Sequence, residues 1–215
     1  MGRIPTVLVT GFEPFGGEDI NPSWMAAQAL HGRMVAGHRL IGAQLPCVFG
    51  HSLEVLRGLL HRHRPALVIG TGQAAGRAAL SFERVAINVN DARIPDNDKA
   101  QPVDTPVVSG GPAAYFTSLP IKAMLASLLA EGINAEVSQT AGTFVCNHVF
   151  YGLMHELATQ RDLRRARGGF IHVPWLPAQG QPSMRLDEIV QGLKIGIACA
   201  LTTVEDIRKE AGSLN

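Results

Sequence analysis

One of the three cysteines of this chain stands where a thiol could act as a nucleophile. Cys146 follows the small residues Ala141 to Thr143 and precedes apolar residues that recur at helical spacing from Val149 to Leu157. This pattern predicts that Cys146 lies in the first turn of an amphipathic helix. Free backbone N–H groups and the positive end of the helix dipole favour a thiolate there. We therefore expect the Cys146 thiol to be acidic and reactive.

The other two cysteines are expected to be small core hydrophobes, as an arbitrary buried cysteine usually is. Cys199 lies in the all-apolar segment 195–201, and Cys47 follows Pro46 at the end of a predicted strand. Only Cys146 has glycine and small polar residues before it and polar residues after it. The sequence therefore offers one candidate nucleophile.

A thiol nucleophile needs a base, and His172 has the most suitable context among the eight histidines. The segment 168–175 predicts a short buried strand that ends at a proline, and strand ends are where sites assemble in open α/β sheets. His148 and His155 lie on the same predicted helix as Cys146 at spacings that do not face the thiol. A core histidine bonded to a backbone carbonyl is the alternative interpretation of His172.

Glu83 interrupts an otherwise apolar, strand-like run over residues 79–87. Its ordinary role would be an ion pair with Arg84, but adjacent residues of a strand point to opposite faces. Glu83 is then available to orient an imidazole, the third role that nucleophilic catalysis of this kind requires. The sequence thus predicts a trio of Glu83, Cys146 and His172.

Such a trio needs a fold that gathers three distant segments, and the predicted elements alternate between strand and helix. Strands are expected at 6–10, 40–45, 66–70, 133–137 and 168–175, and helices at about 22–30, 52–61, 121–130, from Cys146 onward, and 186–209. The first strand is uninterruptedly apolar, as strands buried on both faces of parallel sheets are. We expect one α/β domain over residues 1–215, a three-layer sandwich with a twisted, largely parallel central sheet and helices on both faces.

The stretch 88–108 resists assignment, because it holds four aspartates and three prolines with little periodicity. Loops of this length are commonly functional or disordered. Its acidic residues lack the glycine and terminal glutamate of a helix–loop–helix calcium loop. No metal site is predicted there.

Composition disfavours several classes of function. The 215 residues are 46% hydrophobic with no linker-like segment, which suits one packed domain. A net charge of +1, from 19 basic and 18 acidic residues, gives no attraction to nucleic acid or an anionic membrane. No apolar run approaches a bilayer span, and no signal-peptide pattern is expected at the N-terminus. Three cysteines without framework spacing suit a reducing cytoplasm, where a free thiol survives.

Four ordered segments resemble the pyroglutamyl-peptidase I, or pyrrolidone-carboxylate peptidase, family of cysteine peptidases. They are residues 9–17 with Asn21-Pro22, 72–88, 138–147 and 169–175. The resemblance extends from about residue 6 to the C-terminal helix without an insertion or a missing motif. It implies an α/β fold, removal of an N-terminal pyroglutamyl residue from peptides, no cofactor and assembly as a homotetramer. It also implies a Glu-Cys-His triad, which falls on Glu83, Cys146 and His172.

The implied substrate group is a compact, uncharged γ-lactam, whose pocket needs apolar walls and a few polar contacts. Phe12, Phe15 and Phe144 are expected to supply the walls. The first two lie in a glycine- and proline-rich turn where we expect them to be exposed, and the resemblance places them beside the substrate ring.

Polar contacts to the lactam are expected from Gln73 and Asn21. Asn21 is equally suited to cap the helix that begins at Pro22. Backbone N–H groups near Cys146, aided by the region of Arg93, are expected to stabilise an oxyanion.

Two other functions compete with a peptidase. A nucleoside phosphorylase-like transferase would share glycine-rich strand ends, require phosphate and survive alkylation of its thiols. A binding module for a small molecule or a protein partner would keep its function in Cys146→Ala.

Overall fold

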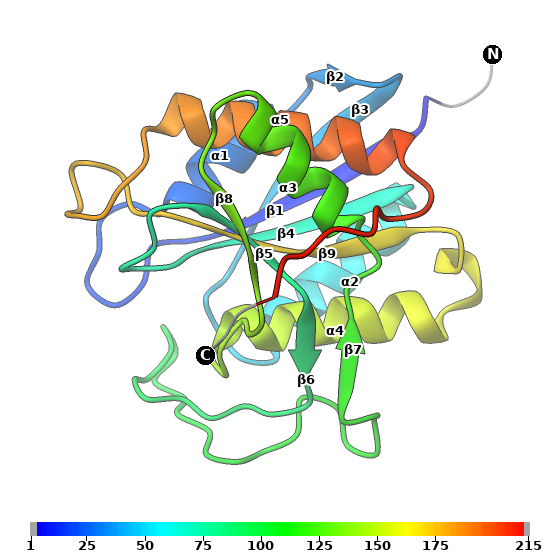
Figure 1. Ribbon diagram of the computed structural model, residues 1–215. Helices are drawn as coiled ribbons and strands as arrows, with labels where there is room; N and C mark the ends of the chain where they lie inside the picture. Colours follow the sequence, from blue (N-terminus) through cyan, green and yellow to red (C-terminus); the bar gives the residue numbers. More distant parts are fainter. Residues whose placement is uncertain (1–3, 213–215) are drawn as a thin grey trace.

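The computed structural model describes residues 4–212 and shows a seven-stranded sheet between two layers of helices (Figure 1). The strands are β1 (Thr6–Phe12), β2 (Met34–Val35), β3 (His38–Leu45), β4 (Leu67–Gln73), β5 (Leu80–Glu83), β8 (Ala135–Ser138) and β9 (Arg167–Val173). They lie in the order β2-β3-β1-β4-β9-β5-β8. Neighbours are parallel except in the β2–β3 and β5–β9 pairs. The sheet is therefore largely parallel, as expected.

Helices cover both faces of this sheet. They are α1 (Pro22–Leu30), α2 (His51–His63), α3 (Ile121–Ala130), α4 (Val145–Thr159) and α5 (Leu186–Thr202), with a 3₁₀ turn at Arg161–Leu163. Helices α1, α3 and α5 pack on one face, and α2 and α4 on the other (Figure 1). This arrangement confirms the three-layer α/β class. None of the helices in the described part of the chain is long and apolar enough to cross a membrane.

The central strands are buried on both faces because their apolar residues do not alternate with polar ones. In β1, Val7 and Val9 belong to the core under α1, α3 and α5, whereas Leu8 belongs to the core under α2 and α4. In β4, Ile69 belongs to the core under α1, α3 and α5, and Val68 belongs to the core under α2 and α4. This double burial fixes the carboxyl ends of the central strands, where the predicted site residues lie.

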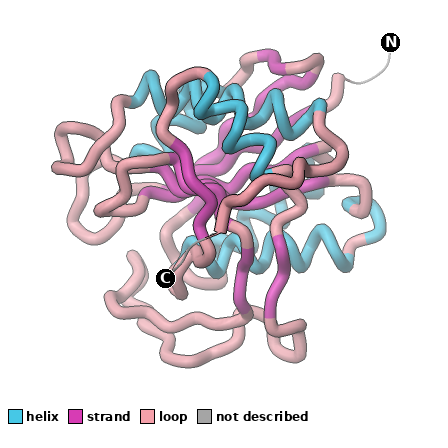
Figure 2. Tube along the Cα trace, viewed as in Figure 1, coloured by secondary structure: helices cyan, strands magenta, loops and turns pink. Residues whose placement is uncertain are grey.

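A separate two-stranded ribbon carries the stretch that the sequence left unassigned (Figures 1 and 2). Strands β6 (Val85–Ile87) and β7 (Ala114–Phe116) pair antiparallel below α4. Between them the chain folds around buried Asp96, whose carboxylate accepts hydrogen bonds from the N–H groups of Phe49, Asp98 and Ala100. Asp96 therefore organises the loop. In residues 4–212 no group of three or more His, Cys, Asp or Glu side chains is arranged to hold a metal.

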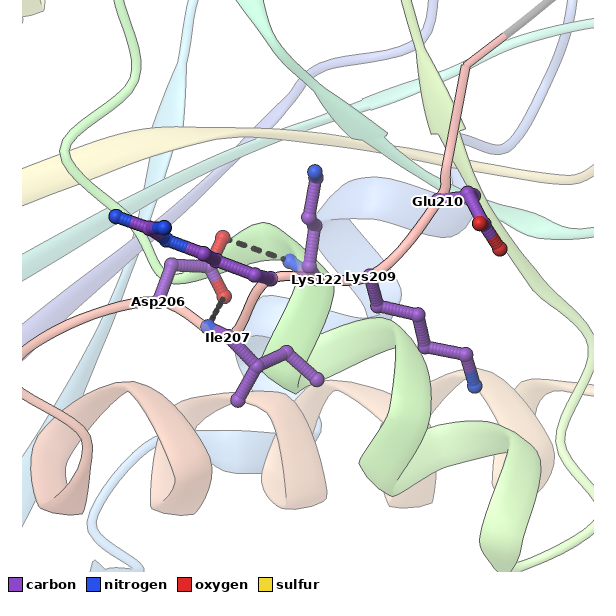
Figure 3. A pocket seen from close by; sticks show the side chains of 6 residues that line it. Lys122, Asp206, Ile207, Lys209 and Glu210 are labelled. Atoms are coloured by element: carbon purple, nitrogen blue, oxygen red, sulfur yellow. Dashed lines mark hydrogen bonds between the residues drawn. The ribbon is translucent and has the colours of Figure 1, made fainter.

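The C-terminal helix is shorter than predicted, because α5 ends at Thr202 and not near residue 209. The Arg167 guanidinium donates to the Ala200 and Thr203 carbonyls. These carbonyls would accept backbone hydrogen bonds within the helix if α5 continued. The tail then crosses the N-terminus of α3, where the Asp206 carboxylate accepts from the N–H group of Lys122 (Figure 3) and from that of Ala123. The shallow pocket that Figure 3 shows is lined by Lys122 and residues 206–210 and contains no predicted site residue.

Candidate active site

Cys146 lies over the carboxyl end of β4. It is the second residue of α4, and a Cβ placed on Gly72 would lie only 2.7 Å from its Sγ. Gly72 is aligned with His172 in the parallel β4–β9 pair. A glycine at this point of β4 thus makes room for the thiol beside the strand that carries His172.

His172 and Glu83 are hydrogen-bonded to each other in the buried interior. The imidazole Nδ1 donates to Glu83 Oε1 at 2.7 Å, and the two residues are 4% and 0% exposed. Ser81 is aligned with His172 in the antiparallel β5–β9 pair, so Glu83 is a diagonal neighbour of His172 on the same face. The ring of Phe170 packs at the edge of the imidazole with centroids 5.1 Å apart. This bond leaves Nε2 as the nitrogen that can exchange a proton.

Arg77 is a third partner of this pair, and the sequence did not single it out. Its Nη1 donates to Glu83 Oε1 at 2.8 Å, and its Nη2 donates to the Thr140 carbonyl at 3.4 Å. Arg84, the sequence neighbour of Glu83, instead donates to the Ala211 carbonyl. The expectation that Glu83 and Arg84 point apart is therefore confirmed. An arginine in the glycine-containing turn before β5 was the signal that could have indicated Arg77.

The expected acidity of the Cys146 thiol is wrong. The pKa of Cys146 is raised to about 12, mainly by burial and in part by the charge of Glu83, while Arg77 acts to lower it. Loss of water around the thiolate thus outweighs the favourable field of the helix N-terminus. The resting thiol is neutral and needs a base to become a nucleophile.

The first turn of α4 offers backbone donors to a developing negative charge. Phe144 is the N-cap residue, and its side chain supplies no capping hydrogen bond. The first N–H groups of a helix have no partner within it. They lie beside the Cys146 side chain, where an oxyanion would form. Arg93 is exposed in the loop that follows β6, and it makes no hydrogen bond to the trio within residues 4–212.

The residues after Cys146 anchor this helix end. Asn147 is fully buried; its Nδ2 donates to the Ile87 and Val89 carbonyls, and its Oδ1 accepts from Ile87 N–H. His148 Nε2 accepts from Gly50 N–H at 3.0 Å, so the protonated Nδ1 donates to Asn90. Burial lowers the pKa of His148 to about 4. His148 is thus a neutral structural residue, and its partners Gly50 and Asn90 agree with the expectation that it does not serve the thiol.

Aromatic residues gather near the N-terminus of α4. The rings of Phe15 and Phe144 have centroids 5.9 Å apart, and Phe49, which the sequence did not indicate, packs edge-on against Phe144 at 5.4 Å. The expected exposure of Phe12 is wrong: it is 2% exposed and packs against Phe170. Phe12 is the last residue of β1 and not part of the turn, which accounts for its burial.

The two predicted polar contacts have different surroundings. Asn21 is buried and caps α1: its Oδ1 accepts from the N–H and hydroxyl of Ser23, and its Nδ2 donates to the Glu13 carbonyl. Gln73, the last residue of β4, accepts through Oε1 from Gln179 Nε2 at 3.3 Å. Gln179 lies in the loop after β9, which sequence reasoning did not connect with the site.

Comparison with known proteins adds an independent finding. Residues 5–203 match the family described as Pyroglutamyl peptidase. The chain is 57% identical to the pyrrolidone-carboxylate peptidase of Cupriavidus taiwanensis, across 99% of this chain and 100% of that protein. It is 58% identical to the pyrrolidone-carboxylate peptidase 1 of Ralstonia nicotianae, with the same coverage.

Solved structures agree with the sequence relatives. Pyroglutamyl peptidase I from Bacillus amyloliquefaciens superposes with a TM-score of 0.94 and 48% identity, across 97% of this chain and 100% of that chain. A mutant pyrrolidone carboxyl peptidase from Pyrococcus furiosus gives a TM-score of 0.87 and 43% identity, across 91% and 98%.

Proposed function

The chain belongs to the pyroglutamyl peptidase family, and on that basis we propose that Cys146, His172 and Glu83 carry out its reaction, the removal of an N-terminal pyroglutamyl residue from peptides. The observation that carries this assignment is the buried hydrogen bond between Glu83 and His172. His172 lies on β9, the strand next to β4, and Cys146 covers the carboxyl end of β4. The hydrogen bond supplies an oriented base beside a thiol that is not ionised at rest.

The proposed reaction is acyl transfer. His172 Nε2 takes the thiol proton as Cys146 Sγ attacks the pyroglutamyl carbonyl carbon, and N–H groups of the first turn of α4 stabilise the oxyanion. His172 then gives the proton to the leaving amine as the C–N bond breaks, which leaves a thioester. Water, deprotonated by His172, attacks the thioester and releases pyroglutamate and the free thiol. Throughout, Glu83 holds the imidazole with Nδ1 protonated and stabilises its positive charge.

The substrate contacts are also part of the proposal. The close pair of Phe15 and Phe144 supports an apolar wall for the lactam ring. Phe12 belongs to the buried core cluster against which both of these rings pack. Gln73 would contribute its amide N–H group, because its oxygen already accepts from Gln179. For Asn21 the structure supports a role in holding the turn, since its side chain is engaged by Ser23 and Glu13.

An oxyanion role for Arg93 is also part of the proposal. Its side chain is exposed in the loop that follows β6.

The comparisons do not support the phosphorylase-like alternative, because the relatives and structural neighbours are peptidases. A binding module without chemistry would not need the oriented Glu83–His172 pair. We further propose a single catalytic domain over residues 1–215 that acts in the cytoplasm as a homotetramer. The family resemblance supports the tetramer, and three unpaired cysteines support a reducing compartment. Sedimentation equilibrium tests the tetramer, and a monomer would contradict it.

The function is tested by release of a chromophore from a pyroglutamyl chromogenic amide. We expect Cys146→Ala to fold, as circular dichroism would show, and to lose at least about a thousandfold in kcat/KM, because no other group supplies the attacking atom. Cys199→Ser is the matched control and should keep full activity. Wild-type turnover by Cys146→Ala would exclude Cys146 as the nucleophile.

A further inference from the structure

We propose that Arg77 is a positioning residue of this site. Arg77 and His172 both bond to the same Glu83 carboxylate oxygen, Oε1, and Arg77 keeps Glu83 ionised while His172 is neutral. This inference rests on the proposed function, because it assigns Arg77 a task only if His172 acts as a base. It adds a fourth residue to the trio that sequence and family resemblance indicate.

The geometry around Oε1 is the first argument. Arg77 Nη1 and His172 Nδ1 lie 2.8 and 2.7 Å from this single oxygen, and Oε2 is buried with no hydrogen-bond partner within residues 4–212. Glu83 is 0% exposed, so water does not stabilise its charge. A buried carboxylate without a cation is strongly unfavourable. Since a base must be neutral before it accepts a proton, Arg77 is the group that balances Glu83 in the resting site.

The second argument is the position of Arg77 between two segments of the site. Its Nη2 reaches the Thr140 carbonyl at 3.4 Å, in the loop that leads to α4 and Cys146. Its side chain is 26% exposed, so solvent only partly screens its charge. Arg77 also lowers the pKa of Cys146 against the effects of burial and Glu83. One cation thus acts on the base, on the carboxylate that orients it and on the nucleophile.

Other charged or titratable groups near Glu83 do not duplicate this role. Those facing it are His172 from β9 and Cys146 from α4, while Glu136 of β8 accepts from Ser81 Oγ at 2.7 Å on the adjoining strand. Arg84 is directed to the Ala211 carbonyl. Within the described residues, Arg77 is the cation paired with Glu83 besides His172 itself.

The direction of the expected effect follows from charge. Without the guanidinium, a protonated His172 becomes the sole counterion of Glu83, so the neutral base is scarcer at any given pH. The Cys146 thiol also loses its proton less readily. Both limbs of the kcat/KM profile therefore move to higher pH when Arg77 is neutralised.

The experiment compares two neutral variants, Arg77→Met and Arg77→Gln, with Arg77→Lys and the control Arg84→Met. The first readout is kcat/KM against pH on the pyroglutamyl chromogenic amide. The second is the rate of iodoacetamide labelling of Cys146 against pH, in a Cys199→Ser background. We expect both neutral variants to move the acid limb and the labelling curve upward by about one pH unit. Arg77→Lys should move them by less than half as much, and the profile of Arg84→Met should overlay that of the wild type.

Several results would overturn the inference. One is a neutral variant whose profile keeps its wild-type pH limbs and only falls in height, which indicates packing alone. Another is failure of both neutral variants to fold, which would make Arg77 a structural residue. A wild-type protein that does not cleave the amide would instead refute the proposed function. In that case the labelling curve still reports whether Arg77 acts on Cys146.

Discussion

At Cys146 two electrostatic effects oppose each other. The N-terminus of α4 favours a thiolate, whereas burial and the nearby Glu83 carboxylate favour the neutral thiol. The raised pKa shows that burial dominates. The residue thus resembles a serine nucleophile in needing its proton removed during attack, which gives a role to the oriented histidine on the strand next to the one that the thiol covers.

This difference predicts the pH dependence of alkylation. Because the thiolate is the reactive form and the Cys146 pKa is raised to about 12, the labelling rate should climb by about tenfold per pH unit from pH 6 to pH 9. The measurement is the second-order rate with iodoacetamide in Cys199→Ser, followed by mass spectrometry. Cys47 is the internal control: it is 2% exposed and its pKa is also raised by burial, so it should stay unlabelled. A plateau near neutral pH would indicate a preformed thiolate instead.

At the scale of elements, the close fit of α4 on β4 sets the position of the nucleophile. A Cβ at Gly72 would lie 2.7 Å from Cys146 Sγ and 3.0 Å from the Phe170 ring. Both contacts are shorter than ordinary van der Waals distances, so one of these side chains would have to move. An added methyl group at this point of β4 would therefore displace the thiol or the ring.

We expect Gly72→Ala to fold but to lose about a hundredfold in kcat/KM, since a displacement near 1 Å of a reacting atom costs that much. The assay is again hydrolysis of the pyroglutamyl amide. Gly58→Ala in α2 is the matched control, because its added Cβ meets nothing within 4 Å. It should keep full activity and raise the free energy of unfolding by about 0.5–1 kcal/mol. Unchanged activity in Gly72→Ala would contradict the placement of Sγ.

The C-terminal tail stabilises α3 through one side chain. Asp206 accepts from the N–H group of Lys122 at 3.0 Å (Figure 3) and from that of Ala123 at 2.8 Å, in place of a side-chain cap from the helix itself. We expect Asp206→Ala to lower the free energy of unfolding by about 1 kcal/mol and Tm by about 2–4 °C, with kcat/KM unchanged. Glu205→Ala, at the exposed neighbouring position, should have no effect on Tm. Equal Tm values for the two variants would show that the tail does not cap α3.

For the whole molecule, the arrangement of charges around the aromatic cluster bears on substrate choice. Glu13 and Glu18 are the carboxylates beside Phe15 in the sequence, and both are engaged. Glu13 accepts from Cys47 N–H and the Asn97 amide, and Glu18 accepts from the Gln179 amide. A neutral lactam needs no carboxylate, whereas a charged terminal amine does.

We therefore expect kcat/KM for pyroglutamyl amides to exceed that for prolyl amides by at least about a hundredfold. Burying an unpaired ammonium costs several kcal/mol, and each 1.4 kcal/mol or so changes kcat/KM about tenfold. Prolyl amides share the ring but carry a charged nitrogen, and glutaminyl amides test the open-chain amine. The three substrates are compared at equal enzyme concentration. Similar kcat/KM values for pyroglutamyl and prolyl amides would contradict a neutral-lactam pocket.

Local patterns in the sequence were enough for much of the architecture. Apolar periodicity and caps predicted α1 and α3 with nearly the observed bounds, and the uninterrupted apolar run at the start of the chain predicted the central strand β1. The trio of Glu83, Cys146 and His172 also followed from local context, since strand ends and helix starts are short-range features. The pyroglutamyl peptidase family was evident from four ordered motifs.

Only the tertiary structure decided how these residues affect one another. Glu83 and His172 are 89 positions apart, and their shared contact with Arg77 depends on an antiparallel β5 that the alternating pattern did not predict. The burial of Phe12 and the neutral state of the Cys146 thiol likewise depend on neighbours distant in sequence. Periodicity and capping act over one or two turns of chain. Desolvation and charge pairing depend on everything within a few ångströms, and only the folded chain determines what that is.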